Sequence, residues 1–152
     1  MDSFLVLPGG HLLPAPGSPF TGQGLGQLGA EFSPARPWQL FVSNAHNGTG
    51  LGTVSAYRDG LLGQLTSIGS SPYADGQTAP CWVEISHDGR YLFTVNTGSG
   101  NISSYSINPD GSLVLCPAHR PHCQPPPRGS PPHGAGAGPP RSLTPGGPGR
   151  TT

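Results

Sequence analysis

Residues 80–115 read as four short β-strands joined by tight turns. β-branched and aromatic residues alternate with polar ones in the runs CWVEI, YLFTVN, ISSYSI and SLVL, which is typical of antiparallel strands. Between these runs, Asp88-Gly89 and Asp110-Gly111 supply the backbone conformations that tight turns need. No window of adequate length keeps apolar residues at helical spacing. The sequence therefore predicts an all-β chain.

The same unit occurs earlier in the chain, over residues 30–73. Residues 40–44 correspond to residues 92–96, and residues 54–57 correspond to residues 102–105. The two copies are separated by about 50 residues, which is in the range where four-stranded units build β-propellers. This repeat restricts the possible folds more than any other feature of the sequence.

A partial copy opens the chain at residues 3–20, where only the last two strands of a unit are expected, at 3–6 and 12–13. Together with the two full copies, it predicts a partial β-propeller of about two and a half four-stranded blades, spanning residues 1–115. Because each blade of a propeller is apolar on both faces, the open faces of such a fragment are expected to promote self-association.

The repeat also carries a family resemblance. The pattern S-x-D-G-R-Y-L-F-x-V-N at 86–96, followed by G-x-I-S-x-Y-x-I at 100–107 and D-G-S-L at 110–113, resembles the lactonase family of seven-bladed β-propellers. The resemblance covers residues 3–115. It implies a hydrolase fragment whose parent activity, in carbohydrate metabolism, is the opening of a sugar lactone such as 6-phosphogluconolactone, with a small-molecule substrate and no cofactor.

Two alternatives remain, a non-catalytic propeller that binds or scaffolds a partner and an inactive truncated product. The family commonly has Pro-Arg-His at the start of the first strand of a blade, whereas this chain has Pro80-Cys81-Trp82. Any role that rests on that histidine therefore does not transfer to this chain.

Lactone hydrolysis needs a base that activates water and donors that hold the developing oxyanion. His46 lies in a polar loop and is one candidate for the base, although it also fits a solvated loop residue. Glu31 and Glu84 occupy equivalent places in the first strands of the two full repeats, where burial would raise the pKa of a carboxyl group. Their alternative role is structural, as acids that help to pack the blades. The loops expected to surround a ligand at one end of the propeller are 44–47, 77–80 and 96–98.

The pattern stops abruptly after residue 115. Residues 116–152 hold 11 Pro, 7 Gly, 4 Arg and no acidic residue, a composition that cannot bury an apolar face and predicts disorder. A truncated or frameshifted propeller explains this break, and a natural low-complexity linker is the alternative. The spacing of Cys116, His119, His122 and Cys123 matches no standard zinc finger, so no metal site is predicted.

Several classes of protein are disfavoured. The formal net charge is zero, and no basic face with interleaved aromatic residues suggests nucleic-acid binding. No apolar stretch approaches membrane-spanning length, and the N-terminus lacks the features of a signal peptide. The cytoplasm is therefore the expected location.

Overall fold

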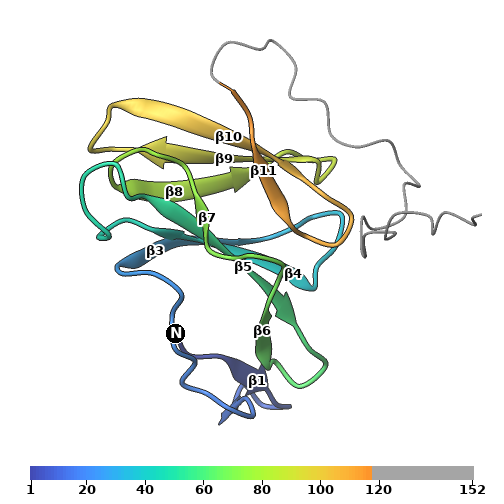
Figure 1. Cartoon of the computed structure of the whole chain (residues 1–152). Coiled ribbons are helices and arrows are strands. Elements are labelled where there is room, and N and C mark those ends of the chain that lie inside the picture. The colour runs from blue at the N-terminus through green and yellow to red at the C-terminus, as the bar shows by residue number, and fades with distance from the viewer. Residues whose placement is uncertain (118–152) are drawn as a thin grey trace, which may run out of the picture.

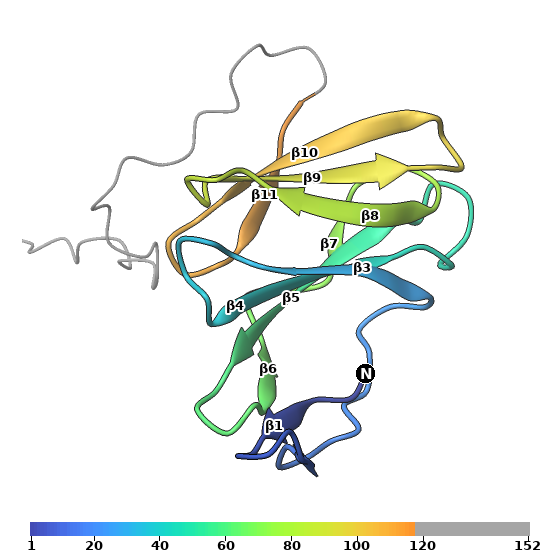
Figure 2. The same ribbon diagram turned by 180° about the vertical axis from the view of Figure 1, so that it is seen from behind.

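The computed structural model describes residues 1–117, and every regular element in this range is a β-strand. The strands form three antiparallel sheets, which Figures 1 and 2 show stacked one on another. This part of the chain contains no helix that is long and apolar enough to cross a membrane. The all-β partial propeller predicted from the sequence is confirmed. The disorder predicted for residues 116–152 stays a prediction, because the residues after 117 lie outside the described range.

The first sheet, the N-terminal half-blade, consists of two antiparallel strands in which Leu5 lies opposite Leu13. Its strands are β1 (Phe4–Val6) and β2 (Leu12–Pro14). They correspond to the two strands expected at the start of the chain. The turn between them is closed by a hydrogen bond from the Leu7 amide to the His11 carbonyl (2.8 Å).

The second sheet is the first full blade, with the order β3-β4-β5-β6. Its strands are β3 (Gln27–Phe32), β4 (Gln39–Asn44), β5 (Thr53–Asp59), β6 (Leu65–Ser67) and β7 (Tyr73–Ala74). The sequence predicts a single fourth strand, but the structure divides it in two. β6 pairs with the end of β5, and the short β7 pairs with its beginning. The segment between β6 and β7 contains Ser70-Ser71-Pro72, and Pro72 has no amide hydrogen for a ladder hydrogen bond.

The third sheet is the second full blade, with the order β11-β10-β9-β8. Its strands are β8 (Pro80–Ile85), β9 (Tyr91–Asn96), β10 (Asn101–Ile107) and β11 (Leu113–Leu115). The pairing register repeats that of the first full blade. Glu31 lies opposite Phe41 in one blade, and Glu84 lies opposite Phe93 in the other. The repeat found in the sequence is therefore a repeat of strand pairing.

The main hydrophobic core lies between the two full blades. The first full blade contributes side chains such as Phe41 and Val54, and the second contributes side chains such as Leu92 and Tyr105, all of them without solvent exposure. A smaller core on the opposite face of the first full blade contains Leu40, Val42 and Tyr57, with Met1 and Leu65 packed against it. The half-blade covers this second face only in part.

Each full blade also contains a buried asparagine at the end of its second strand. Asn44 Nδ2 donates to Ser55 Oγ (2.9 Å), and Asn96 Nδ2 donates to Ser103 Oγ (2.8 Å). Both asparagines are fully buried. Because the same network occurs in both blades, these residues hold neighbouring strands together rather than form a single site.

Candidate functional site

The structure brings together the loops that the sequence suggests as a ligand-binding end. The Gly52 amide donates to the Gln77 carbonyl (2.8 Å), and the Gly50 amide donates to Thr78 Oγ1 (2.9 Å). The Thr78 amide in turn donates to Ser99 Oγ (2.8 Å). Hydrogen bonds therefore join the loops that follow β4, β7 and β9 into one surface.

His46 belongs to this surface. Its side chain is exposed, its amide donates to the Leu25 carbonyl (3.0 Å), and its ring lies directly against Gly26, where no side chain could be added without a clash. These contacts position the loop, and the imidazole remains accessible to solvent.

The structure does not place His46 with the two glutamates. Asn44, two residues before His46, pairs with Gln27 at the beginning of β3, whereas Glu31 pairs with Phe41, which lies three residues before Asn44 in β4. At about 3.3 Å per residue, Asn44 and Phe41 are separated by about 10 Å along β4. Glu31 therefore lies toward the opposite end of the blade, where the turns that follow β3 and β8 meet at Ala35 and Gly89.

Glu31 and Glu84 are close enough to interact. Burial raises the pKa of Glu31, the negative charge of Glu84 raises it further, and a hydrogen bond from the Ile85 amide opposes both effects. Glu31 is half-buried, and its Oε2 atom is buried without a hydrogen-bond partner. Glu84, which the sequence places in a buried position, is exposed. Its side chain lies on the face of β8 opposite to Val83 and Ile85, which pack against the first full blade.

A cavity of about 350 Å³ lies beside this pair, between β3 and β8. Its walls combine apolar residues with the two carboxylates and include no arginine, lysine or histidine; they are Leu28, Gly29, Ala30, Glu31, Trp82, Val83 and Glu84. The strands approach closely at Gly29, where an added Cβ atom would lie 2.8 Å from the Val83 amide nitrogen. A carboxyl group with a raised pKa on the wall of a cavity can accept a proton from water.

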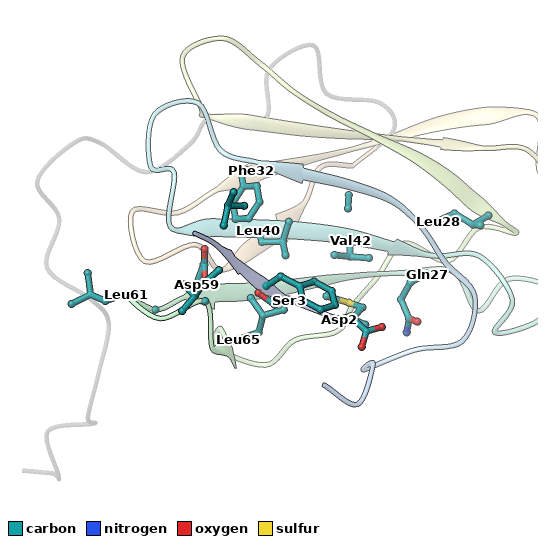
Figure 3. A pocket seen from close by; sticks show the side chains of 17 residues that line it. Asp2, Ser3, Gln27, Leu28, Phe32, Leu40, Val42, Asp59, Leu61 and Leu65 are labelled. Carbon is teal, nitrogen blue, oxygen red and sulfur yellow. The ribbon is translucent and has the colours of Figure 1, made fainter. Parts of the chain in front are cut away.

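A larger groove of about 640 Å³, here named the N-terminal groove, separates the half-blade from the first full blade. Figure 3 shows Phe32, Leu40 and Val42 on the blade, and Asp2 and Ser3 on the N-terminal segment. Most of the lining is apolar, with Asp59 as an exception. Burial raises the pKa of the Asp59 carboxyl group, whose Oδ1 atom is buried without a partner.

This groove was not predicted from the sequence, although the repeat contains a signal for it. Asp59 occupies the repeat position that Ile107 fills in the second full blade, where the isoleucine is buried against the first. An acid in the first repeat at a position that is apolar in the second indicates that the faces of the two blades are not covered in the same way.

No metal centre emerges from residues 1–117, in which no group of three or more His, Cys, Asp or Glu side chains could hold a metal ion. Of the four residues considered for zinc, only Cys116 is within this range. His119, His122 and Cys123 lie outside the described residues.

The chain is similar to known proteins in sequence and in fold. Residues 36–140 match the family described as lactonase, 7-bladed beta-propeller. The fold is similar to a crystal structure from Bacteroides fragilis NCTC 9343, named as that of a candidate 6-phosphogluconolactonase, with 22% sequence identity and a TM-score of 0.54. The match covers 70% of this chain but only 29% of that one. No curated protein matches the sequence.

Proposed function

Because this chain belongs to the lactonase family of seven-bladed β-propellers, we propose that it is part of a hydrolase that opens a sugar lactone. The name of the structural neighbour makes 6-phosphogluconolactone the first substrate to test. The cytoplasm as its location remains a prediction from the sequence alone.

The observation that carries this proposal is the environment of Glu31. In the proposed reaction, its carboxylate accepts a proton from water while the water oxygen adds to the lactone carbonyl carbon. The ring C–O bond then breaks, and the proton passes to the departing alkoxide to give the hydroxy acid. Burial and the charge of Glu84 raise the pKa of Glu31, which makes its carboxylate a stronger base.

The lining of the β3–β8 cavity raises a question about the substrate. Two carboxylates and no cationic side chain line it, whereas arginine and backbone amides are the groups that recognise phosphate best. The assay should therefore compare 6-phosphogluconolactone with unphosphorylated glucono-1,5-lactone, at a mildly acidic pH where spontaneous opening is slow.

The roles of the candidate residues can be separated in the same assay. Glu31→Gln is expected to lower kcat by about 100-fold or more, the usual contribution of a general base. Glu84→Gln removes the charge that helps to raise the pKa of Glu31 and should lower activity far less than Glu31→Gln. His46→Ala tests the loop histidine. The exposed turn residue His87 provides a control in His87→Gln. Full activity of Glu31→Gln would rule out its role as the base.

One observation favours a non-catalytic propeller as the second candidate. The Glu31 carboxylate accepts a hydrogen bond from the Ile85 amide, which links the first strands of the two full blades. A carboxylate with this hydrogen bond can have a purely structural role, in which it holds the two blades together. If neither lactone is opened faster than in buffer, by this chain or by a longer relative with the same residue, a binding or scaffold role is favoured.

A further inference from the structure

β3 and β8 are edge strands of the two full blades, and they lie side by side (Figure 2). Each pairs with a single neighbour within residues 1–117, β3 with β4 and β8 with β9. Half of the backbone amides of an edge strand point into its ladder, and the other half point away from it. The amides that point away from the ladder are donors that a ligand can use.

The register of β8 determines which of its amides point to the free edge. The Ser86 amide donates to the Tyr91 carbonyl (2.9 Å), so the hydrogen-bonded pairs of β8 are those at its even-numbered positions. The amides of Val83 and Ile85 therefore point away from β9. The hydrogen bond from the Ile85 amide to the Glu31 carboxylate agrees with this direction.

The same register occurs in β3. The Ser33 amide donates to the Gln39 carbonyl (2.9 Å), so the amide of Ala30 points away from β4. Ala30 and Val83 occupy equivalent positions in the two blades, and both line the β3–β8 cavity. Neither amide has a ladder partner within the described residues. Two backbone donors from adjacent blades therefore border the same cavity as the Glu31 carboxylate.

We propose that the amides of Val83 and Ala30 form the oxyanion hole of this cavity, where they donate hydrogen bonds to the lactone carbonyl oxygen as negative charge builds on it. The inference rests on the proposed function, in which Glu31 is the base. Backbone amides that are fixed in strands suit this role, because they are oriented before the reaction begins and need no reorganisation during it.

The spacing of the groups fits the reaction. Val83 and Ile85 are two residues apart, which places their amides about 7 Å from each other on the same edge of β8. The Ile85 amide holds the Glu31 carboxylate, so the base and the Val83 donor lie along one edge. One water molecule and the carbonyl carbon that it attacks, about 3–3.5 Å apart in a reactive pose, fit between them.

Gly29 keeps the space beside the Val83 donor free of side-chain atoms. An added Cβ atom at this position would lie 2.8 Å from the Val83 amide nitrogen and 3.1 Å from the Cys81 carbonyl oxygen. Any larger residue would therefore crowd the edge of β8 at the point where the donor lies. The glycine thus allows the two edges to approach while a small carbonyl group reaches the amide.

A stable lactam tests the contact without catalysis. Glucono-1,5-lactam carries its carbonyl group where the lactone does, and it is titrated into the isotope-labelled full chain and followed by NMR. We expect the amide proton signals of Val83 and Ala30 to move downfield and to saturate. The Phe32 amide points to the same edge of β3 but does not border the cavity, so its signal should not move. Unmoved Val83 and Ala30 signals would overturn the proposal.

Replacement of single amides by esters tests the catalytic role, since an ester keeps the side chain and removes the N–H donor. An ester at Val83 or Ala30 should lower kcat by about 100-fold, the usual cost of losing one oxyanion donor, and leave the pH profile unchanged. The matched control is an ester at Ile85. It removes the bond that lowers the pKa of Glu31, so it should shift the pH profile to higher pH. Wild-type kcat in the Val83 or the Ala30 ester would overturn the proposal.

The two experiments separate this inference from the proposed function. If the chain opens no lactone but the lactam moves both amide signals, the hydrolase proposal fails, whereas the assignment of the two donors stands. If Glu31→Gln abolishes lactone opening but neither amide signal moves and the Val83 ester is fully active, the assignment fails and the proposed function stands.

Discussion

Glu31 and Glu84 occupy equivalent positions in the first strands of adjacent blades, and the charge of Glu84 raises the pKa of Glu31. Glu84→Gln removes that charge and should lower the pKa of Glu31, without returning it to the ordinary value of 4.5 because burial remains. Titration of the Glu31 carboxyl carbon by NMR measures this change directly. An unchanged titration curve would show that the two carboxyl groups do not interact.

The same raised pKa predicts how stability depends on pH. The folded chain holds the Glu31 proton more tightly than the unfolded chain, so its contribution is fully present below the unfolded pKa and is lost as the pH rises through the folded pKa. Glu31→Gln should flatten this part of the profile of unfolding free energy against pH. Glu84→Gln should move the loss to lower pH, which distinguishes the two variants.

The close approach of β3 and β8 predicts that Gly29 tolerates no side chain. An added Cβ atom would lie 2.8 Å from the Val83 amide nitrogen and 3.0 Å from Trp82 Cα, and both atoms belong to backbone that cannot rotate away. Gly29→Ala should destabilise the fold by about 1–3 kcal/mol in denaturant unfolding. At Gly76 the added atom would meet nothing within 4 Å, although its φ is +68°. Gly76→Ala is therefore a control for backbone strain without a clash.

Tyr57 and Tyr105 are equivalent residues with different hydroxyl environments. The Tyr57 hydroxyl accepts a hydrogen bond from the Gln23 amide (3.2 Å), whereas the Tyr105 hydroxyl is buried without a partner. Tyr57→Phe should cost about 0.5–1.5 kcal/mol, and Tyr105→Phe should be neutral or stabilising. Thermal and denaturant unfolding of both variants would check this, and equal losses of stability would contradict it.

We propose that the outer face of the second full blade drives self-association. Phe41 and Val54 are 0% exposed, but their counterparts Phe93 and Ile102 are 38% and 67% exposed. In sedimentation velocity experiments, the sedimentation coefficient should therefore rise with protein concentration. Phe93→Lys or Ile102→Lys should reduce this rise. Leu61→Lys, at a fully exposed turn position, is the control. A wild-type chain that sediments as a monomer at all concentrations would contradict the proposal.

The sequence was sufficient to predict the strands, because alternation and Asp-Gly turns are local signals and the repeat reinforces them. It was not sufficient to predict which faces are covered. Glu31 and Glu84 have nearly identical surroundings in the sequence, yet one is half-buried and the other exposed, because only β3 has a following blade within the described residues. The division of the fourth strand into β6 and β7 was also missed, since it depends on contacts with β5 rather than on the pattern of residues 65–74.

The buried asparagines have a consequence for how such a chain folds and lengthens. A slip of one residue between the second and third strands would turn Asn44 or Asn96 away from its serine and leave a buried amide without its acceptors. Each blade thus contains a contact of its own that favours the correct alignment of its strands. Duplication of a whole blade would copy its asparagine and serine together with the strands. A gene could therefore gain or lose blades while the remaining ones keep the contact that favours correct register.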